Sequence, residues 1–286
     1  MDTDNPLGRF LRARRALTSP QQTGLPQTGR RRVPGLRREE VAILSGVSTD
    51  YYVRLEQGRE RSPSAQVVDA LARTLDLDED ARAHLHRLAH PTGTVRRPAP
   101  GDERVSAALV SMMAGWHRTP ALILGRRLNV LAHNALGAAL FDGHTHSRDL
   151  LRLVFLDPSA REFYPDWEQI AAGTVAALRA GAAEEADDPR FAATVGELCL
   201  KSEEFARLWA RHDVRHKTHA SKRFHHRLVG ELTLDYETLT VNSAPGQQLV
   251  VYQAAPDSTS EQALALLGSL TASDSAARDP HPAPER

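Results

Sequence analysis

Residues 37–58 read RREEVAILSGVSTDYYVRLEQG, and this stretch decides the fold of the N-terminal part of the chain. It predicts two helices, 37–45 and 48–57, which cross at a tight turn. Such a crossing needs a small residue on the first helix, here Ala42. It also needs a glycine in the turn, here Gly46, because glycine adopts positive φ angles without strain. The stretch therefore predicts a helix-turn-helix motif.

The two predicted helices share an apolar side and a polar side. Val41, Val47, Tyr52 and Leu55 fall on one side and form the expected buried face. The opposite side of the second helix carries donors and acceptors that suit base edges in the major groove of DNA, and the start of the first helix suits a backbone phosphate. We therefore predict DNA contacts from Arg38, Ser48, Thr49, Asp50, Tyr51, Val53, Arg54 and Gln57.

Charge is divided unevenly along a chain whose formal net charge is zero. Residues 1–97 hold 17 arginines, no lysine and 12 acidic residues, so this part is basic and the remainder is acidic. A basic segment suits a polyanion, and the guanidinium group suits phosphate and guanine. Arg30, Arg31 and Arg32 form a further cluster in a loop. We expect them either to contact DNA phosphates or the minor groove, or to remain a solvated run of charge.

At 286 residues the chain is long enough for two domains. Further helical patterns at 7–17, 65–75 and 78–89 complete an all-α domain over 1–90, and the proline-rich segment 91–104 is predicted as a linker. A mixed domain follows over 105–270, and the Pro-, Ala- and Ser-rich tail 271–286 is expected to be disordered. The mixed domain shows strand patterns at 121–124, 128–132, 223–226, 230–240 and 248–254, and helix patterns at 134–140, 149–155, 166–180, 189–200, 202–211 and 260–270.

Several classes of protein are disfavoured by the sequence. No apolar run is long enough to span a bilayer, and the polar N-terminus differs from a secretory signal, so we expect a cytoplasmic protein without a membrane partner. The single Cys199 agrees with a reducing compartment. The Gly-rich nucleotide motifs, the G-x-S-x-G elbow and the H-E-x-x-H metal motif are all missing, so no enzyme and no catalytic residue is predicted.

Two alternative functions remain open from the residues alone. Histidines are dense, and His86 and His90 stand at a helical spacing that can share a metal, which would suit a metal-binding enzyme; we predict no metal site because no cysteine pair or acidic partner stands at ligand spacing. The other alternative is a helix-turn-helix fold that serves as a protein-interaction module. The histidines that favour the metal-binding alternative include, besides His86 and His90, a cluster in the sequence formed by His212, His216, His219, His225 and His226.

The segment GRRRVPGLRREEVAILSGVSTDYYVRLEQGRERSPSAQVVDALARTL, residues 29–75, resembles the DNA-binding domain of the MmyB-like regulators. These are bacterial, mostly actinobacterial, members of the Xre/Cro-type helix-turn-helix group. The resemblance continues in NVLAHNALGAALF, LLRLVFLDPSAREFYPDW, LWARHDV, GELTLDYETL and GQQLVVY, so it covers nearly the whole chain. The chain departs from the family at His226 and Arg227, where a proline-containing turn is typical, and at Ile43, which replaces a commonly polar residue.

The resemblance implies an α+β protein with a lambda-repressor-like helical domain and a PAS-like ligand-binding domain containing an antiparallel sheet. It also implies a small-molecule effector, since a fatty acid has been associated with the pocket of that domain; no other cofactor is expected. Double-stranded DNA is the expected macromolecular partner, and we expect a homodimer because helix-turn-helix readers commonly bind palindromes in pairs. Polar residues within apolar elements are candidates either to orient the ligand or to tie the structure together: Asn134, Arg152, Asp166, His212, Asp235 and Tyr236.

Overall fold

The computed structural model of the chain describes residues 5–23, 34–60, 62–90, 103–182, 188–215 and 219–278. The chain divides into two compact units: residues 1–100 with 175–216, and residues 101–174 with 217–286. Helix α10 (Trp167–Ala182) has residues in both, since the division falls between residues 174 and 175. Within the described part, no helix is both long and apolar enough to cross a bilayer. Residues 91–102 of the predicted linker, Arg30, Arg31, Arg32 and residues 279–286 lie outside the described residues.

The first unit consists of short helices whose ends follow local capping signals. Ser64 and Asp78 accept hydrogen bonds from the amides of Val67 and Ala81, and so begin two of them. The five helices predicted for this region are present, with ends within one residue of the predicted bounds. The elements are α1 (Pro6–Leu17), the 3-10 turn η1 (Pro20–Thr23), α2 (Arg38–Ser45), α3 (Thr49–Glu56), α4 (Ala65–Thr74), α5 (Glu79–Ala89), α11 (Pro189–Lys201) and α12 (Glu203–Ala210).

One apolar core holds the first unit together. Phe10, Tyr52 and Leu85, from three different helices, are fully buried in it. Burial of each such side chain stabilises the fold by about 1.5–3 kcal/mol. Ala180 and Val214 belong to the same core although they lie far along the chain. The end of α10 and the segment after α12 are thus part of the same compact unit as the helix-turn-helix.

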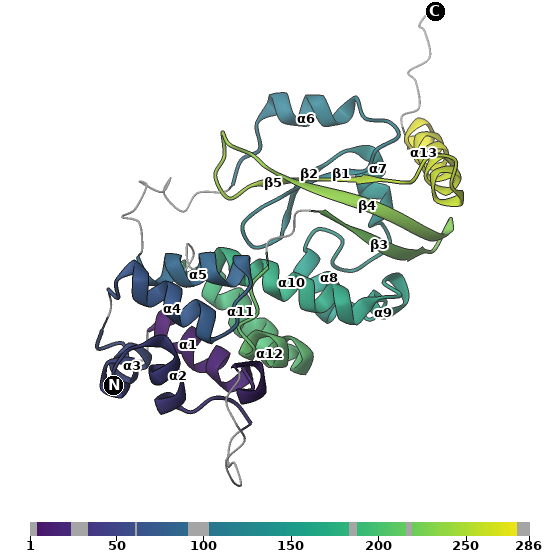
Figure 1. Ribbon diagram of the computed structural model, residues 1–286. Helices are drawn as coiled ribbons and strands as arrows, with labels where there is room; N and C mark the ends of the chain where they lie inside the picture. The colour runs from purple at the N-terminus through teal and green to yellow at the C-terminus, as the bar shows by residue number, and fades with distance from the viewer. Residues whose placement is uncertain are drawn as a thin grey trace, which may run out of the picture. The chain divides into compact units, whose positions relative to one another are not determined.

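The second unit contains a five-stranded antiparallel sheet in the order β2-β1-β5-β4-β3 (Figure 1). The α+β class predicted from the sequence is confirmed. The elements of this unit besides the start of α10 are α6 (Ala107–Ala114), β1 (Ala121–Leu124), β2 (Val130–His133), α7 (Ala135–Leu140), α8 (Leu150–Leu156), α9 (Ala160–Phe163), β3 (His219–His226), β4 (Gly230–Thr240), β5 (Gln248–Gln253) and α13 (Thr259–Arg278).

The register of the sheet gives it two apolar faces. Val250 pairs with Leu122 and Thr238, and these three side chains lie on one face together with the paired Tyr236 and Tyr252. Helices α8 and α9 and the beginning of α10 lie on this side of the sheet, and α6 lies on the opposite side (Figure 1). The opposite face packs Ile123 and Leu249 against Met113 of α6. Both faces of the central strands are therefore covered.

Four elements of this unit differ from the sequence prediction. Helices α6 and α9 are not predicted, since α6 is apolar all round and lacks a helical period, and α9 has a single turn. Strand β3 begins at His219, four residues before the predicted start, because each of its residues pairs with β4. Helix α13 continues past residue 270 to Arg278; the sequence beyond 270 is rich in alanine and reaches its first proline at Pro280.

Candidate functional site

The turn between α2 and α3 has the geometry that its sequence predicts. Gly46 adopts a left-handed conformation with φ 71° and ends α2. The Val47 amide donates to the Ala42 carbonyl at 3.0 Å, which closes the turn. Ser48 then caps α3, since its hydroxyl accepts a hydrogen bond from the Tyr51 amide at 3.1 Å. The turn at Gly46 and the cap at Ser48 together determine where α3 begins and how it leaves α2.

Helix α3 presents an exposed polar face. Thr49, Asp50, Arg54 and Gln57 are exposed, whereas Tyr51 and Val53 are half-buried at its border. The Arg54 guanidinium forms an ion pair with the Asp50 carboxylate at 3.0 Å. An exposed pair of this kind stabilises a helix by less than about 1 kcal/mol. Arg54 can therefore turn from Asp50 to another acceptor, such as a guanine edge, at small cost.

A buried carboxylate lies behind this face. The Glu56 side chain is fully buried and accepts hydrogen bonds from Arg15 Nε at 2.6 Å and Arg38 Nε at 2.7 Å. Burial works to raise the pKa of Glu56, but the two guanidinium groups outweigh it and leave that pKa below its ordinary value. Arg38, predicted to contact phosphate, is thus held by Glu56 while its side chain stays 45% exposed.

The position of Glu56 is the main feature that sequence reasoning missed in this region. A helical wheel contains the signal, because Glu56 follows the buried Tyr52 by four residues. A carboxylate on an apolar helix face requires cationic partners, and the nearby helices supply Arg15 and Arg38. Ile43, the departure from the family on α2, is 75% exposed and lies outside the core.

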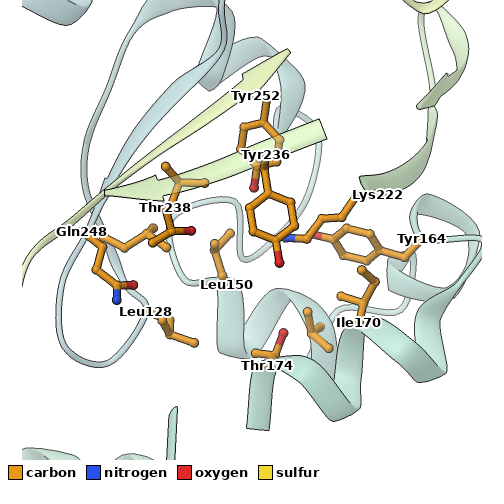
Figure 2. Close-up of a pocket in the computed structure, with 13 residues that line it drawn as sticks. Leu128, Leu150, Tyr164, Ile170, Thr174, Lys222, Tyr236, Thr238, Gln248 and Tyr252 are labelled. Carbon is orange, nitrogen blue, oxygen red and sulfur yellow. The ribbon is translucent and has the colours of Figure 1, made fainter. Parts of the chain in front are cut away.

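The second unit encloses a small pocket between the sheet and helices α8 and α10 (Figure 2). Its free volume is about 20 Å³, enough for roughly one water molecule. Most lining groups are aliphatic or aromatic, and the polar groups among them come mainly from the strands. The lining residues are Leu124, Leu128, Leu150, Val154, Tyr164, Ile170, Thr174, Lys222, Tyr236, Thr238, Gln248, Val250 and Tyr252.

Lys222 brings a positive charge to this pocket. Figure 2 shows its side chain extending from β3 toward Tyr236 and Tyr164. The Lys222 Nζ lies 4.3 Å from the centroid of the Tyr236 ring and 5.7 Å from that of Tyr252. The faces of these aromatic rings attract the ammonium group. An anion that entered the pocket would interact with the ammonium group more strongly than in bulk water, because the surrounding groups are largely apolar. The pocket therefore combines aliphatic and aromatic lining groups with one cationic side chain.

Two buried tyrosines remain neutral beside this cation. Burial raises the pKa of Tyr164 and of Tyr252 above the ordinary value of 10. Both hydroxyl groups consequently keep their protons at neutral pH and can donate hydrogen bonds. Sequence reasoning missed Lys222 and these tyrosines. The available signal was the alternation in β3, where Lys222 is in phase with the buried Phe224.

Three of the predicted ligand-orienting residues make structural contacts away from this pocket. The Asn134 side chain accepts hydrogen bonds from the amides of Ala121 and Gly137. Arg152 forms an ion pair with Asp149 one helical turn away. Asp166 forms an ion pair with Arg223, with an oxygen 2.7 Å from Arg223 Nε.

The other three lie in different places. His212 belongs to the first unit, where its ring lies 6.4 Å from that of Phe10. Asp235 is exposed on the face of β4 opposite Tyr236. Tyr236 itself lines the pocket, and of the six predicted residues it is the one that does so. His226 and Arg227, the departure from the family, do not line it either.

The described histidines do not assemble a metal site. In the described ranges, no three His, Cys, Asp or Glu side chains come close enough together to hold a metal ion. His86 instead contacts Asp69, with Nε2 2.8 Å from the carboxylate oxygen, and Arg82 joins the same carboxylate. His216 lies outside the described residues.

Two family models match the chain, one in each part of the sequence. Residues 105–267 match the ligand-binding domain of MmyB-like transcription regulators, and residues 6–85 match a helix-turn-helix domain. A search of curated proteins finds no match. The two family matches identify a DNA-binding transcription regulator that carries a ligand-binding domain, and the first covers more than half of the chain. The chain therefore belongs to the family of MmyB-like transcription regulators, as its sequence motifs predict.

Proposed function

We propose that this regulator reads one duplex sequence through α3 and that a small apolar acid, such as a fatty acid, changes that reading by occupying the pocket in the second unit. The observation that carries the ligand class is the ammonium group of Lys222 among the mainly aliphatic and aromatic lining groups of the pocket. A carboxylate would form an ion pair with this ammonium group, and an alkyl chain would replace water along the aliphatic wall.

The helix-turn-helix formed by α2 and α3 contacts DNA with the exposed face of α3. Arg54 and Gln57 reach base edges in the major groove, while Arg38, steadied by Glu56, contacts a phosphate at the start of α2. Thr49 and Asp50 lie at the first turn of α3, where side chains of recognition helices commonly meet bases. These roles assign base reading to α3 and phosphate contact to α2.

Ligand entry requires movement of the pocket wall. A free volume of about 20 Å³ accepts one water molecule and not an alkyl chain. We propose that a bound chain displaces lining side chains that helices α8 and α10 contribute, among them Leu150, Ile170 and Thr174. Ile170 and Thr174 belong to α10, whose C-terminal half contributes Ala180 to the core of the DNA-binding unit. We propose that this movement is the source of the coupling between ligand and DNA.

The ligand class is tested with palmitic acid and hexadecanol on the full chain after delipidation. Charge recognition predicts that the acid binds roughly tenfold more tightly than the alcohol, or more. Lys222→Met keeps the length of the side chain and removes its charge, so it should abolish that preference. Lys201→Met, at a 60% exposed lysine on α11, is the matched control and should preserve it. Equal affinity of the wild-type chain for acid and alcohol would refute recognition of a carboxylate.

Coupling is tested by measuring operator affinity with and without palmitic acid. Allosteric regulators typically change affinity by about 5- to 150-fold between the two states. An operator affinity that is the same without palmitic acid and at saturating palmitic acid would show that the pocket does not control DNA reading through this ligand.

We propose that the active form is a homodimer and that it needs no further cofactor.

A further inference from the structure

Thr238 of β4 brings an uncharged hydroxyl group to the pocket of the second unit. Its Oγ1 atom is buried, and no residue in the described part of the chain forms a hydrogen bond with it. Figure 2 shows this side chain among those that face the pocket. A buried hydroxyl group without a partner destabilises the fold, so Thr238 is positioned to bind a polar group of a molecule that enters the pocket.

The register of the sheet separates Thr238 from the cation of the same pocket. Lys222 of β3 pairs with Leu234 of β4, and Thr238 follows Leu234 by four residues. Paired residues share one face of a sheet, as do alternate residues of one strand, so Lys222 and Thr238 lie on the same face. Tyr236 lies between them (Figure 2), and the Lys222 ammonium group is 4.3 Å from the centroid of its ring. Because residues two apart on a strand are separated by about 7 Å, Thr238 meets a part of the ligand that is several atoms away from its carboxylate.

A second uncharged polar side chain lies near Thr238. Gln248 of β5 lines the same pocket and pairs with Thr240, two residues after Thr238. Gln248 and Thr238 are therefore diagonal neighbours on adjacent strands, and both can donate and accept hydrogen bonds. Of the described residues that line the pocket, Lys222 is the only one with a charged side chain. This part of the pocket therefore suits an uncharged oxygen and disfavours a second carboxylate.

We propose that the ligand is a hydroxylated chain acid, whose carboxylate pairs with Lys222 and whose hydroxyl group, farther along the chain, forms hydrogen bonds with Thr238 and Gln248. This inference deepens the proposed function and rests on it for the site and for the carboxylate. An unsubstituted fatty acid would surround the Thr238 hydroxyl with methylene groups and leave it without a partner, whereas a hydroxylated chain satisfies it. A site of this kind discriminates against the analogue that lacks the hydroxyl group.

Isothermal titration calorimetry of the delipidated full chain tests the ligand class. The probes are palmitic acid and monohydroxypalmitic acids with the hydroxyl group at successive carbon atoms. At least one hydroxy acid should bind roughly tenfold more tightly than palmitic acid. The isomer with its hydroxyl group on the carbon next to the carboxyl group should show no gain, because that oxygen stays beside the carboxylate and does not reach Thr238.

Variants of Thr238 assign the gain to its hydroxyl group. Thr238→Val keeps the shape of the side chain, so it should abolish the gain while palmitic acid binds as tightly as before or more tightly. Thr238→Ser keeps the hydroxyl group and should preserve the gain. Thr233→Val is the matched control, because Thr233 is exposed on the opposite face of β4, and it should behave as the wild-type chain. Circular dichroism verifies that each variant is folded.

Two results would overturn this inference: no hydroxypalmitic acid binds more tightly than palmitic acid, or Thr238→Val preserves the gain. Hexadecanol and the corresponding diols separate it from the proposed function. A chain that prefers palmitic acid to hexadecanol but gains nothing from any hydroxyl group refutes the hydroxylated ligand alone. A Thr238-dependent gain that is present in both acids and diols, without any preference for acids over alcohols, refutes carboxylate recognition alone.

Discussion

Arg14 on α1 and Asp213 after α12 form an ion pair, with Arg14 Nη1 2.9 Å from the Asp213 carboxylate, although 199 residues separate them. Within the same unit, the Arg179 guanidinium of α10 lies 3.5 Å from the centroid of the Trp209 ring of α12. Residues 175–216 fall inside the match to the ligand-binding domain, yet they pack in the same compact unit as the helix-turn-helix. The DNA reader is therefore stabilised by helices that the family match assigns to the ligand-binding domain.

The His212 ring gives this unit a dependence on pH. Burial, followed by the nearby Arg179 charge, lowers the pKa of His212 from 6.5 to about 3, so the folded unit holds a neutral ring. Below pH 6.5 the unfolded chain takes up a proton that the folded chain does not bind, so stability falls as the pH drops toward 3, by at most about 1.4 kcal/mol per pH unit. His212→Asn, which tolerates the positive φ of 55° at this position, should remove this dependence.

Hydrogen exchange of α1 and α5 in urea at pH 7 and pH 5 measures this effect. His90→Asn, at an exposed histidine that follows α5, serves as control and should keep the wild-type pH dependence. If His212→Asn loses as much protection between the two pH values as the wild-type chain, another group is responsible for the titration.

The buried Glu56 side chain should be essential to the stability of the first unit, which contains the helix-turn-helix. Glu56→Gln leaves the Arg15 and Arg38 guanidinium groups without their carboxylate and should reduce the free energy of unfolding of the first unit by about 3 kcal/mol. The lowered pKa of Glu56 means that its contribution is complete above about pH 4.5 and is lost as the pH falls through the folded-state value.

Urea unfolding at pH 7 compares this variant with Glu39→Gln. Glu39 is exposed on α2, and its substitution changes the net charge by the same amount. We expect the control to stay within about 0.5 kcal/mol of the wild-type chain. Equal midpoints for the two variants would show that the Glu56 pairs contribute nothing.

The Asn134 side chain should support the second unit and not the ligand. Its amide donates to the carbonyls of Thr119 at 2.7 Å and Trp116 at 3.0 Å, in addition to accepting from two backbone amides. Asn134→Ala leaves several buried groups unsatisfied, so it should cost about 3 kcal/mol and lower the Tm of this unit by roughly 10 °C. Calorimetry tests this against the exposed Asn242→Ala, which should have little effect. An unchanged Tm, with palmitic acid binding abolished, would instead make Asn134 a ligand residue.

Local chemistry explains which parts of the fold are predictable. The ends of α2 and α3 follow from Gly46 and Ser48, because a left-handed turn and a helix cap each depend on a single residue. Strand β4 follows from the alternation of Leu232, Leu234 and Tyr236. The exposed face of α3 follows from the same helical period that places Leu55 in the core.

Contacts between distant segments explain the rest. The side of β3 that Lys222 occupies can be read from its phase with Phe224, but the approach of Ile170 from α10 cannot, because tertiary packing brings them together. Helix α6 lacks a polar face, so its sequence shows no helical period. The packing of Val214 with the helices of the reader likewise depends on the course of the chain between them.

The most direct test of the account compares the wild-type chain and Arg54→Ala on an operator selected from a random duplex library and on a scrambled duplex. If α3 reads bases, the wild-type chain enriches one recurrent sequence, and Arg54→Ala weakens binding to it by about 1–3 kcal/mol while binding to the scrambled duplex changes little. Arg82→Ala, at an exposed arginine on α5, should leave this selectivity intact. Failure of the wild-type chain to enrich any sequence, or an equal loss by Arg54→Ala on both duplexes, would contradict base reading by α3.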